Sequence, residues 1–184
     1  MTWDGVRKFL LRRRGLLDAV VFSGGEPTLQ AALPHAVGEV RALGFKVGLH
    51  TAGMFPLKLK RWLALLDWIG MDIKAPFEDY ERITGVPGSG ARARASARLI
   101  LASGIAYEFR TTVHSALLSH LQLMRIGEQL AQLGARCYAI QEFRVRGADP
   151  DRLPRQAHLP VREKDCRSTL SGLFDNLAFR ATAA

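Results

Sequence analysis

Short apolar runs alternate with segments of helical periodicity along the first 145 residues. The runs are rich in β-branched and aromatic side chains and are bounded by glycine or polar residues, which is typical of buried strands. Five strands are predicted, at residues 19–23, 45–50, 68–73, 107–113 and 137–143. Because helical segments separate these strands, the pattern predicts an α/β fold built on a parallel sheet.

The predicted helices carry start and stop signals. Thr2 is placed to cap a first helix, and Gly44 is placed to end a second. Further helices are predicted at residues 57–66, 79–83, 93–102 and 120–133. The rest of the chain is rich in proline and arginine and has one predicted helix, at 162–174. We therefore divide the chain into an α/β unit at 1–146 and a C-terminal extension at 147–184.

Polar residues and glycines gather where the predicted strands end. They are Gly24, Gly25 and Glu26 after the first strand, His50 on the second, Asp72 and Lys74 on the third, Arg110 on the fourth and Gln141 on the fifth. The carboxyl ends of parallel strands meet at one edge, so we expect a ring of polar groups there. Asp72 and Lys74 share one face, so they must either pair with each other or hold a polar ligand. A zwitterionic ligand would suit these charges.

Composition narrows the function classes. With 184 residues the chain can bury one core but is too short for two ordinary domains. Lys and Arg number 26 against 17 Asp and Glu, which gives a net charge of +9. A solvated surface is the simplest explanation of this charge and a docking surface for an acidic partner is the alternative; without a nucleic-acid motif, direct nucleic-acid binding is disfavoured. No apolar run suits a membrane span or a signal peptide, which predicts a cytoplasmic protein.

Three motifs in this order resemble a known family. They are the GGEP turn at 24–27, the Asp-x-Lys strand within WIGMDIKAP at 68–76, and the FRTTV strand at 109–113. Together they resemble radical S-adenosylmethionine (SAM) enzymes of the glycyl-radical activating type, over about residues 1–145. Within that type they are most similar to the activating proteins of anaerobic ribonucleoside-triphosphate reductases. The resemblance implies a partial parallel (β/α) barrel.

The resemblance also implies a role for each polar residue at the strand ends. In this family the GGE turn binds the amino group of SAM, and Asp72 and Lys74 match residues that contact its ribose and its methionine carboxylate. His50 stands where better-known relatives have an acidic residue beside the ribose. Arg110 matches a strand arginine near the sulfonium and carboxylate, and Gln141 stands where a ribose contact from the last strand is expected. The resemblance assigns no catalytic residue in this chain.

Cofactors and partners follow from the same resemblance. In the family reaction a reduced 4Fe-4S cluster gives one electron to SAM, and the resulting 5′-deoxyadenosyl radical takes a hydrogen atom from a glycine of the partner enzyme. The implied partner is a glycyl-radical enzyme, namely an anaerobic ribonucleotide reductase. The implied reductant is a flavodoxin-type electron donor.

Cysteine content departs from the family pattern. The family holds its cluster with a CxxxCxxC loop after the first barrel strand, whereas this sequence has two cysteines, Cys137 and Cys166, far apart. Five predicted βα units also stand against six in the family. We therefore expect no metal ligands in this chain and no activity of the chain alone. Three hypotheses stay open: an N-terminally shortened activating enzyme, a cluster-free SAM-binding or partner-docking protein, and a non-functional gene remnant.

Overall fold

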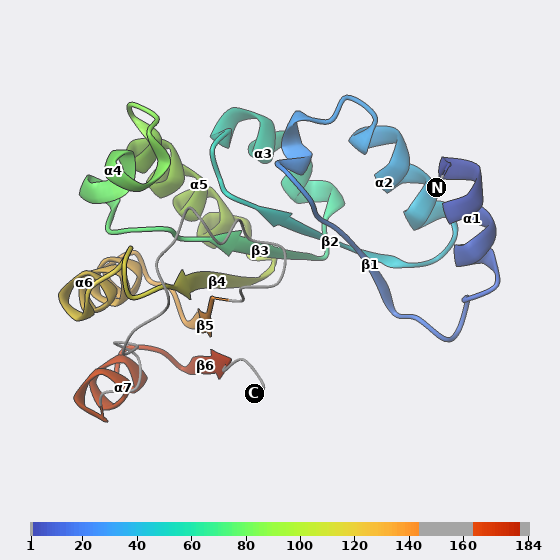
Figure 1. The fold of residues 1–184 in the computed structure, drawn as a ribbon. Helices are drawn as coiled ribbons and strands as arrows, with labels where there is room; N and C mark the ends of the chain where they lie inside the picture. The colour runs from blue at the N-terminus through green and yellow to red at the C-terminus, as the bar shows by residue number, and fades with distance from the viewer. Residues whose placement is uncertain (1, 144–163, 181–184) are drawn as a thin grey trace.

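The structure is a computed structural model that describes residues 2–143 and 164–180, and these residues form one sheet of six parallel strands. The strands follow one another across the sheet in chain order (Figure 1). They are β1 (Ala19–Phe22), β2 (Lys46–Thr51), β3 (Trp68–Asp72), β4 (Ala106–Val113), β5 (Cys137–Glu142) and β6 (Asn176–Arg180). Because every pair is parallel, all six carboxyl ends lie at one edge.

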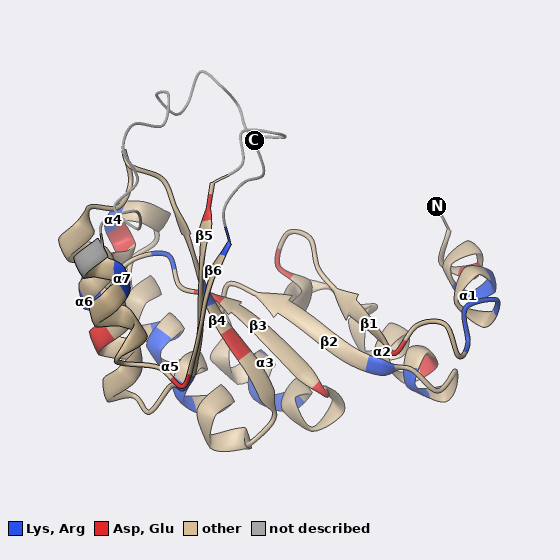
Figure 2. Ribbon diagram, turned by 90° about the horizontal axis from the view of Figure 1, so that it is seen from below, with Lys and Arg blue, Asp and Glu red and all other residues tan. Residues whose placement is uncertain are grey.

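Helices and short 3₁₀ turns connect the strands. The helices are α1 (Trp3–Leu11), α2 (Leu33–Ala42), α3 (Pro56–Trp62), α4 (Tyr80–Thr84), α5 (Ser89–Ser103), α6 (His120–Gln132) and α7 (Lys164–Ser171), and the 3₁₀ turns are η1 (Pro27–Leu29), η2 (Leu63–Leu65) and η3 (Phe77–Asp79). Figure 2 shows the helices that connect the strands along one side of a curved sheet, on the side opposite its concave face. None of the described helices is long and apolar enough to cross a membrane.

The core lies between the sheet and these helices. Leu49 and Ile69 are neighbours in β2 and β3, Met71 and Phe109 are neighbours in β3 and β4, and all four are fully buried. Since successive residues of a strand point to opposite faces, the residues between them face the concave side. The apolar residues that alternate along the strands are therefore those that face the helices, and the concave face of the sheet carries the polar side chains.

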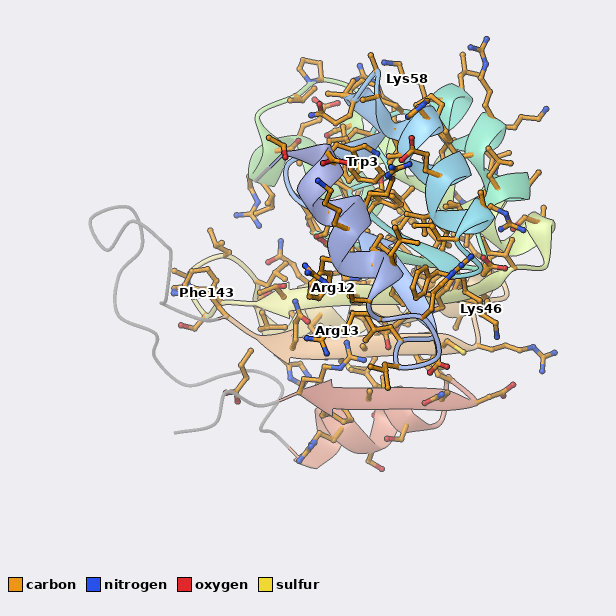
Figure 3. The ribbon with its side chains drawn as sticks, turned by 90° about the vertical axis from the view of Figure 1, so that its right-hand side faces the viewer. Trp3, Arg12, Arg13, Lys46, Lys58 and Phe143 are labelled. Carbon is orange, nitrogen blue, oxygen red and sulfur yellow. The ribbon has the colours of Figure 1, made fainter. Side chains whose placement is uncertain are left out.

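The first helix is fixed at the β1 end of the molecule. Thr2 caps α1 as predicted, its side chain accepting the N–H of Gly5 at 3.3 Å. Trp3 Nε1 donates to Glu39 Oε2 over 2.6 Å, which holds α1 beside α2 (Figure 3). Leu10 completes the contact by entering the core.

The predicted number of strands is wrong, because the C-terminal extension supplies a sixth. β6 pairs in parallel with β5, and the helix predicted at 162–174 is observed as α7. Leu170 and Phe174 join the same core, where the Phe174 ring packs on Tyr138 at 5.1 Å. The boundary at residue 146 lies outside the described residues, so the division into 1–146 and 147–184 stays a prediction.

Candidate functional site

Polar side chains of neighbouring strands meet on the concave face near the carboxyl edge. In the parallel register His50 lies beside Gly70, Asp72 beside Arg110, and Thr112 beside Gln141. Neighbours in a parallel pair share a face, so residues distant in sequence form one polar surface. The ring of polar groups expected at this edge is therefore present around β2 to β5.

Arg110 is the centre of this surface. Its guanidinium is almost completely buried, and Nε and Nη2 donate to Asp72 Oδ1 over 3.1 and 2.7 Å. Nη1 donates to His50 Nδ1 over 2.9 Å. Burial, and then the nearby Arg110 charge, lower the pKa of His50 below its ordinary value, which favours the neutral ring that accepts this bond.

The structure excludes one of the two alternatives drawn from the sequence, a pair between Asp72 and Lys74. Asp72 pairs with Arg110 rather than with Lys74, because the register brings Arg110 directly beside it. The other carboxylate oxygen, Asp72 Oδ2, has no hydrogen-bond partner among residues 2–143 and 164–180. The Lys74 side chain is exposed and likewise has none in that part of the chain. Both groups are therefore available to a ligand.

The turn after β1 combines an open backbone with a fixed carboxylate. Gly24 and Gly25 adopt positive φ angles of 97° and 54°, and a Cβ at either position would meet nothing within 4 Å. Glu26 Oε1 accepts the Thr51 hydroxyl at 2.8 Å and the Thr28 hydroxyl at 2.6 Å. Its Oε2 accepts the Ala52 N–H at 2.8 Å. Glu26 thus ties the turn to the segment directly after His50 and holds a negative charge at the edge.

A cavity of about 300 Å³ opens at the ends of β3 and β4. Asp72, Lys74 and Thr112 supply part of its lining, and His114, one residue beyond the end of β4, supplies another polar group. His114 and Thr112 are not among the site residues predicted from the sequence. The signal was present, since residues 110 and 112 share one face of the predicted strand at 107–113, and residue 114 continues this alternation one position beyond its end.

Two further side chains, Tyr80 and Gln141, stabilise the site through hydrogen bonds. The Tyr80 hydroxyl accepts the backbone N–H of Lys74 at 3.0 Å and donates to the backbone oxygen of Asp72 at 3.3 Å. Gln141 Nε2 donates to Thr112 Oγ1 over 2.8 Å, which places Gln141 at the same edge. No local pattern identified Tyr80, because its role depends on the packing of α4 under the end of β3.

The donor set fits an organic zwitterion better than a metal cluster. Glu26 can attract an ammonium group, Lys74 a carboxylate, and Asp72 Oδ2 hydroxyl groups. Of the two cysteines, Cys137 is half-buried on β5 and Cys166 is buried in α7. Among the described residues no three His, Cys, Asp or Glu side chains are grouped so that they could hold a metal ion.

Comparison with known sequences adds a family match. A family model described as the Radical SAM superfamily matches residues 4–120. PqqA peptide cyclase of Gluconobacter oxydans (strain 621H) is 36% identical over 177 residues, which cover 91% of this chain and 46% of that protein. A protein of Methanocaldococcus jannaschii named as a glycyl-radical enzyme activating enzyme is 28% identical over 140 residues, which cover 71% of this chain and 57% of that protein. The chain spans about half the length of these curated relatives.

Solved structures share the fold. A domain of pyruvate-formate lyase-activating enzyme from Bacteroides vulgatus ATCC 8482 aligns with a TM-score of 0.65 at 13% identity, over 90% of this chain and 99% of that one. Streptococcus suis SuiB bound to S-adenosylmethionine aligns with a TM-score of 0.70 at 12% identity, over 97% of this chain and 44% of that one. At such identities the likeness concerns the fold, and it confirms the predicted α/β partial barrel.

Proposed function

Because this chain belongs to the radical SAM superfamily, we propose that it binds SAM at the carboxyl edge of β1 to β5 and acts in an enzyme of the glycyl-radical activating type. Members of this superfamily use SAM together with a 4Fe-4S cluster. One observation carries the proposal. Glu26, Asp72 and Lys74 present an anion, a hydroxyl acceptor and a cation at one edge, and these are the three groups that an amino acid joined to a ribose requires.

Each polar residue of the edge has a place in this proposal. The open backbone at Gly24 and Gly25 lets the amino-acid end of SAM approach Glu26. Asp72 Oδ2 accepts ribose hydroxyls, and Arg110 holds the Asp72 carboxylate in place. The remaining roles are a ribose-side contact for His50, a carboxylate contact for Lys74 and a further ribose contact for Gln141. In superfamily members SAM and a reduced cluster would together supply a radical for hydrogen abstraction, and the described residues of this chain would hold the SAM.

The cluster is a different case, because the described residues do not fit it. Three thiolates on a short loop leave one iron of the cluster open to SAM, whereas Cys137 and Cys166 lie on a strand and on a helix. We therefore assign to the described residues the binding and orientation of SAM alone.

The proposed partner is a glycyl-radical enzyme of the anaerobic ribonucleotide reductase type, with a flavodoxin-type reductant. The Methanocaldococcus relative supports a glycyl-radical enzyme in general, and the resemblance of the three ordered motifs is the basis for the ribonucleotide reductase type. Modification of a peptide is the second candidate, favoured by the 36% identity to PqqA peptide cyclase over 91% of the chain. Either substrate is a polypeptide, and the net charge of +9 suits an acidic one.

SAM binding tests the proposal by isothermal titration calorimetry. Asp72→Asn is expected to weaken binding at least about tenfold, because a hydrogen bond to a charged group contributes roughly 1.5–3 kcal/mol. Asp175→Asn is the matched control, since Asp175 is exposed, precedes β6 at the opposite edge and pairs with Arg136. Absence of SAM binding by the unaltered chain, or equal losses in both variants, would refute the proposed site.

The two substrate classes can be separated by direct binding. The chain is titrated with a peptide that carries the glycyl-radical loop of an anaerobic ribonucleotide reductase and, separately, with a PqqA-type precursor peptide. Tighter binding of the glycyl-radical loop is expected. Tighter binding of the precursor peptide would favour the peptide-modifying alternative.

A further inference from the structure

His114 lies at the candidate site but has no role in the functions proposed so far. It follows β4 directly, and only 3% of the residue is exposed. Together with Asp72 and Lys74 it lines the cavity of about 300 Å³ at the carboxyl edge. A polar ring held at a cavity wall is available to whatever occupies that cavity.

The surroundings of His114 fix which of its nitrogens carries a proton. The backbone N–H of Ala116 donates to His114 Nδ1 over 3.1 Å. A ring nitrogen that accepts a hydrogen bond is unprotonated, so the neutral ring carries its hydrogen on Nε2. Phe143 packs edge-on against the ring, with centroids 5.2 Å apart and planes at 87°, and limits its rotation. His114 Nε2 has no hydrogen-bond partner in the part of the chain that the structure describes.

Among the described side chains that line this cavity, hydrogen-bond donors outnumber free acceptors. Besides His114 Nε2, the Lys74 ammonium has no partner among the described residues. Thr112 Oγ1 already accepts from Gln141, so its hydroxyl hydrogen remains to be donated. Asp72 contributes acceptors, but one of its oxygens is engaged by Arg110. A surplus of donors beside a cation suits a carboxylate, whose two oxygens accept several hydrogen bonds.

We propose that His114 Nε2–H and the Lys74 ammonium together bind the carboxylate of the methionine moiety of SAM. This role rests on the proposed function, because it requires SAM to occupy the carboxyl edge. It makes His114 a ligand-binding residue whose orientation is set by the Ala116 backbone and the Phe143 ring.

Two substitutions separate the two ring nitrogens. In His114→Asn the amide oxygen can still accept from Ala116, but no donor reaches the position of Nε2. In His114→Gln the longer amide can place an N–H near Nε2 while the Ala116 contact is lost. His114→Asn is expected to weaken SAM binding about tenfold, as befits loss of a hydrogen bond to a charged group, and His114→Gln to recover most of that loss. Thermal unfolding of both variants verifies that they fold.

A ligand without the carboxylate completes the test. Decarboxylated SAM keeps the sulfonium, the ribose and the adenine but offers no carboxylate to His114. The roughly tenfold ratio between the unaltered chain and His114→Asn should therefore fall to about one with this ligand. An unchanged ratio, or full SAM affinity in His114→Asn while Asp72→Asn is impaired, would overturn the role of His114 alone. Absence of SAM binding by the unaltered chain would instead overturn the proposed function.

Discussion

Replacement of Tyr80 by phenylalanine should loosen the strand end that carries Asp72 and Lys74. The Tyr80 ring is fully buried, and its hydroxyl accepts from the Lys74 N–H at 3.0 Å and donates to the Asp72 carbonyl oxygen at 3.3 Å. Burial raises the pKa of Tyr80 above its ordinary value, so the hydroxyl keeps its proton at neutral pH. The substitution removes one oxygen and leaves the packing of the ring unchanged.

The expected cost follows from these two hydrogen bonds. A net hydrogen bond contributes about 1 kcal/mol, and a buried N–H left without a partner costs roughly 1–3 kcal/mol. Since the bond to the Asp72 oxygen is long, we expect Tyr80→Phe to lower the free energy of unfolding by about 2 kcal/mol. For a chain of this size that loss corresponds to a fall in Tm of roughly 4–8 °C.

Urea unfolding followed by tryptophan fluorescence measures this loss, and calorimetry on the same samples measures SAM binding. Tyr107→Phe is the matched control, because the Tyr107 hydroxyl accepts a single backbone N–H, that of Arg136, at the opposite edge of the sheet. Water can replace that exposed contact, so we expect a loss of less than about 1 kcal/mol and unchanged SAM binding. Equal stability of Tyr80→Phe and the unaltered chain, or equal losses in the two variants, would refute this reasoning.

Three further predictions concern charge and metal content. Because burial and Arg110 lower the pKa of His50, the unfolded chain binds a proton at this residue more readily than the folded chain does. The stability due to neutral His50 is therefore present above about pH 6.5 and is lost as the pH falls. His50→Asn should reduce the difference between the urea midpoints measured at pH 5.5 and at pH 7.5. Arg180 and Glu108 form an ion pair across β5 with two hydrogen bonds, of 2.8 and 2.7 Å, and the pair is partly exposed. A double-mutant cycle with Glu108→Gln and Arg180→Met should give a coupling energy of about 1 kcal/mol or less that weakens in salt. A larger coupling energy that does not depend on salt would contradict the partial exposure of the pair. Anaerobic reconstitution of the 184-residue chain with iron and sulfide should leave it without a stoichiometric 4Fe-4S cluster, and iron analysis that finds one would contradict the lack of a cluster site among the described residues.

The five strands with apolar, β-branched or aromatic runs were predictable, and the sixth, more polar strand was not. β1 to β5 lie within a residue or two of their predicted positions, because their helix-facing side chains are apolar and their ends are marked by glycine or polar residues. β6 has the sequence NLAFR and lies at the end of the sheet, where its residues are half-buried or exposed. Unlike β1 (AVVF), this segment has no β-branched residue and has polar residues at both ends, so its pairing with β5 is what makes it a strand.

The edge that carries the site was also predictable, because parallel strands place their carboxyl ends together whatever their exact register. The partners within the site were not. A pair between Asp72 and Lys74 was one of the two alternatives, but Asp72 pairs with Arg110, which is 38 residues away in sequence. That choice depends on β3 and β4 meeting with Asp72 directly beside Arg110.

The sequence by itself therefore determined the α/β class, the strands β1 to β5, the glycine turn before Glu26 and the edge where polar groups gather. These features are local, since side-chain alternation and glycine conformation act over a few residues. Tertiary structure alone decided the sixth strand, the Arg110 contacts, the hydrogen bonds of the Tyr80 hydroxyl to the end of β3 and the proton position on His114. Each of these depends on the distance between atoms of different segments. A hydrogen bond forms only within a range of a few tenths of an ångström, and local sequence does not specify distances between segments so closely.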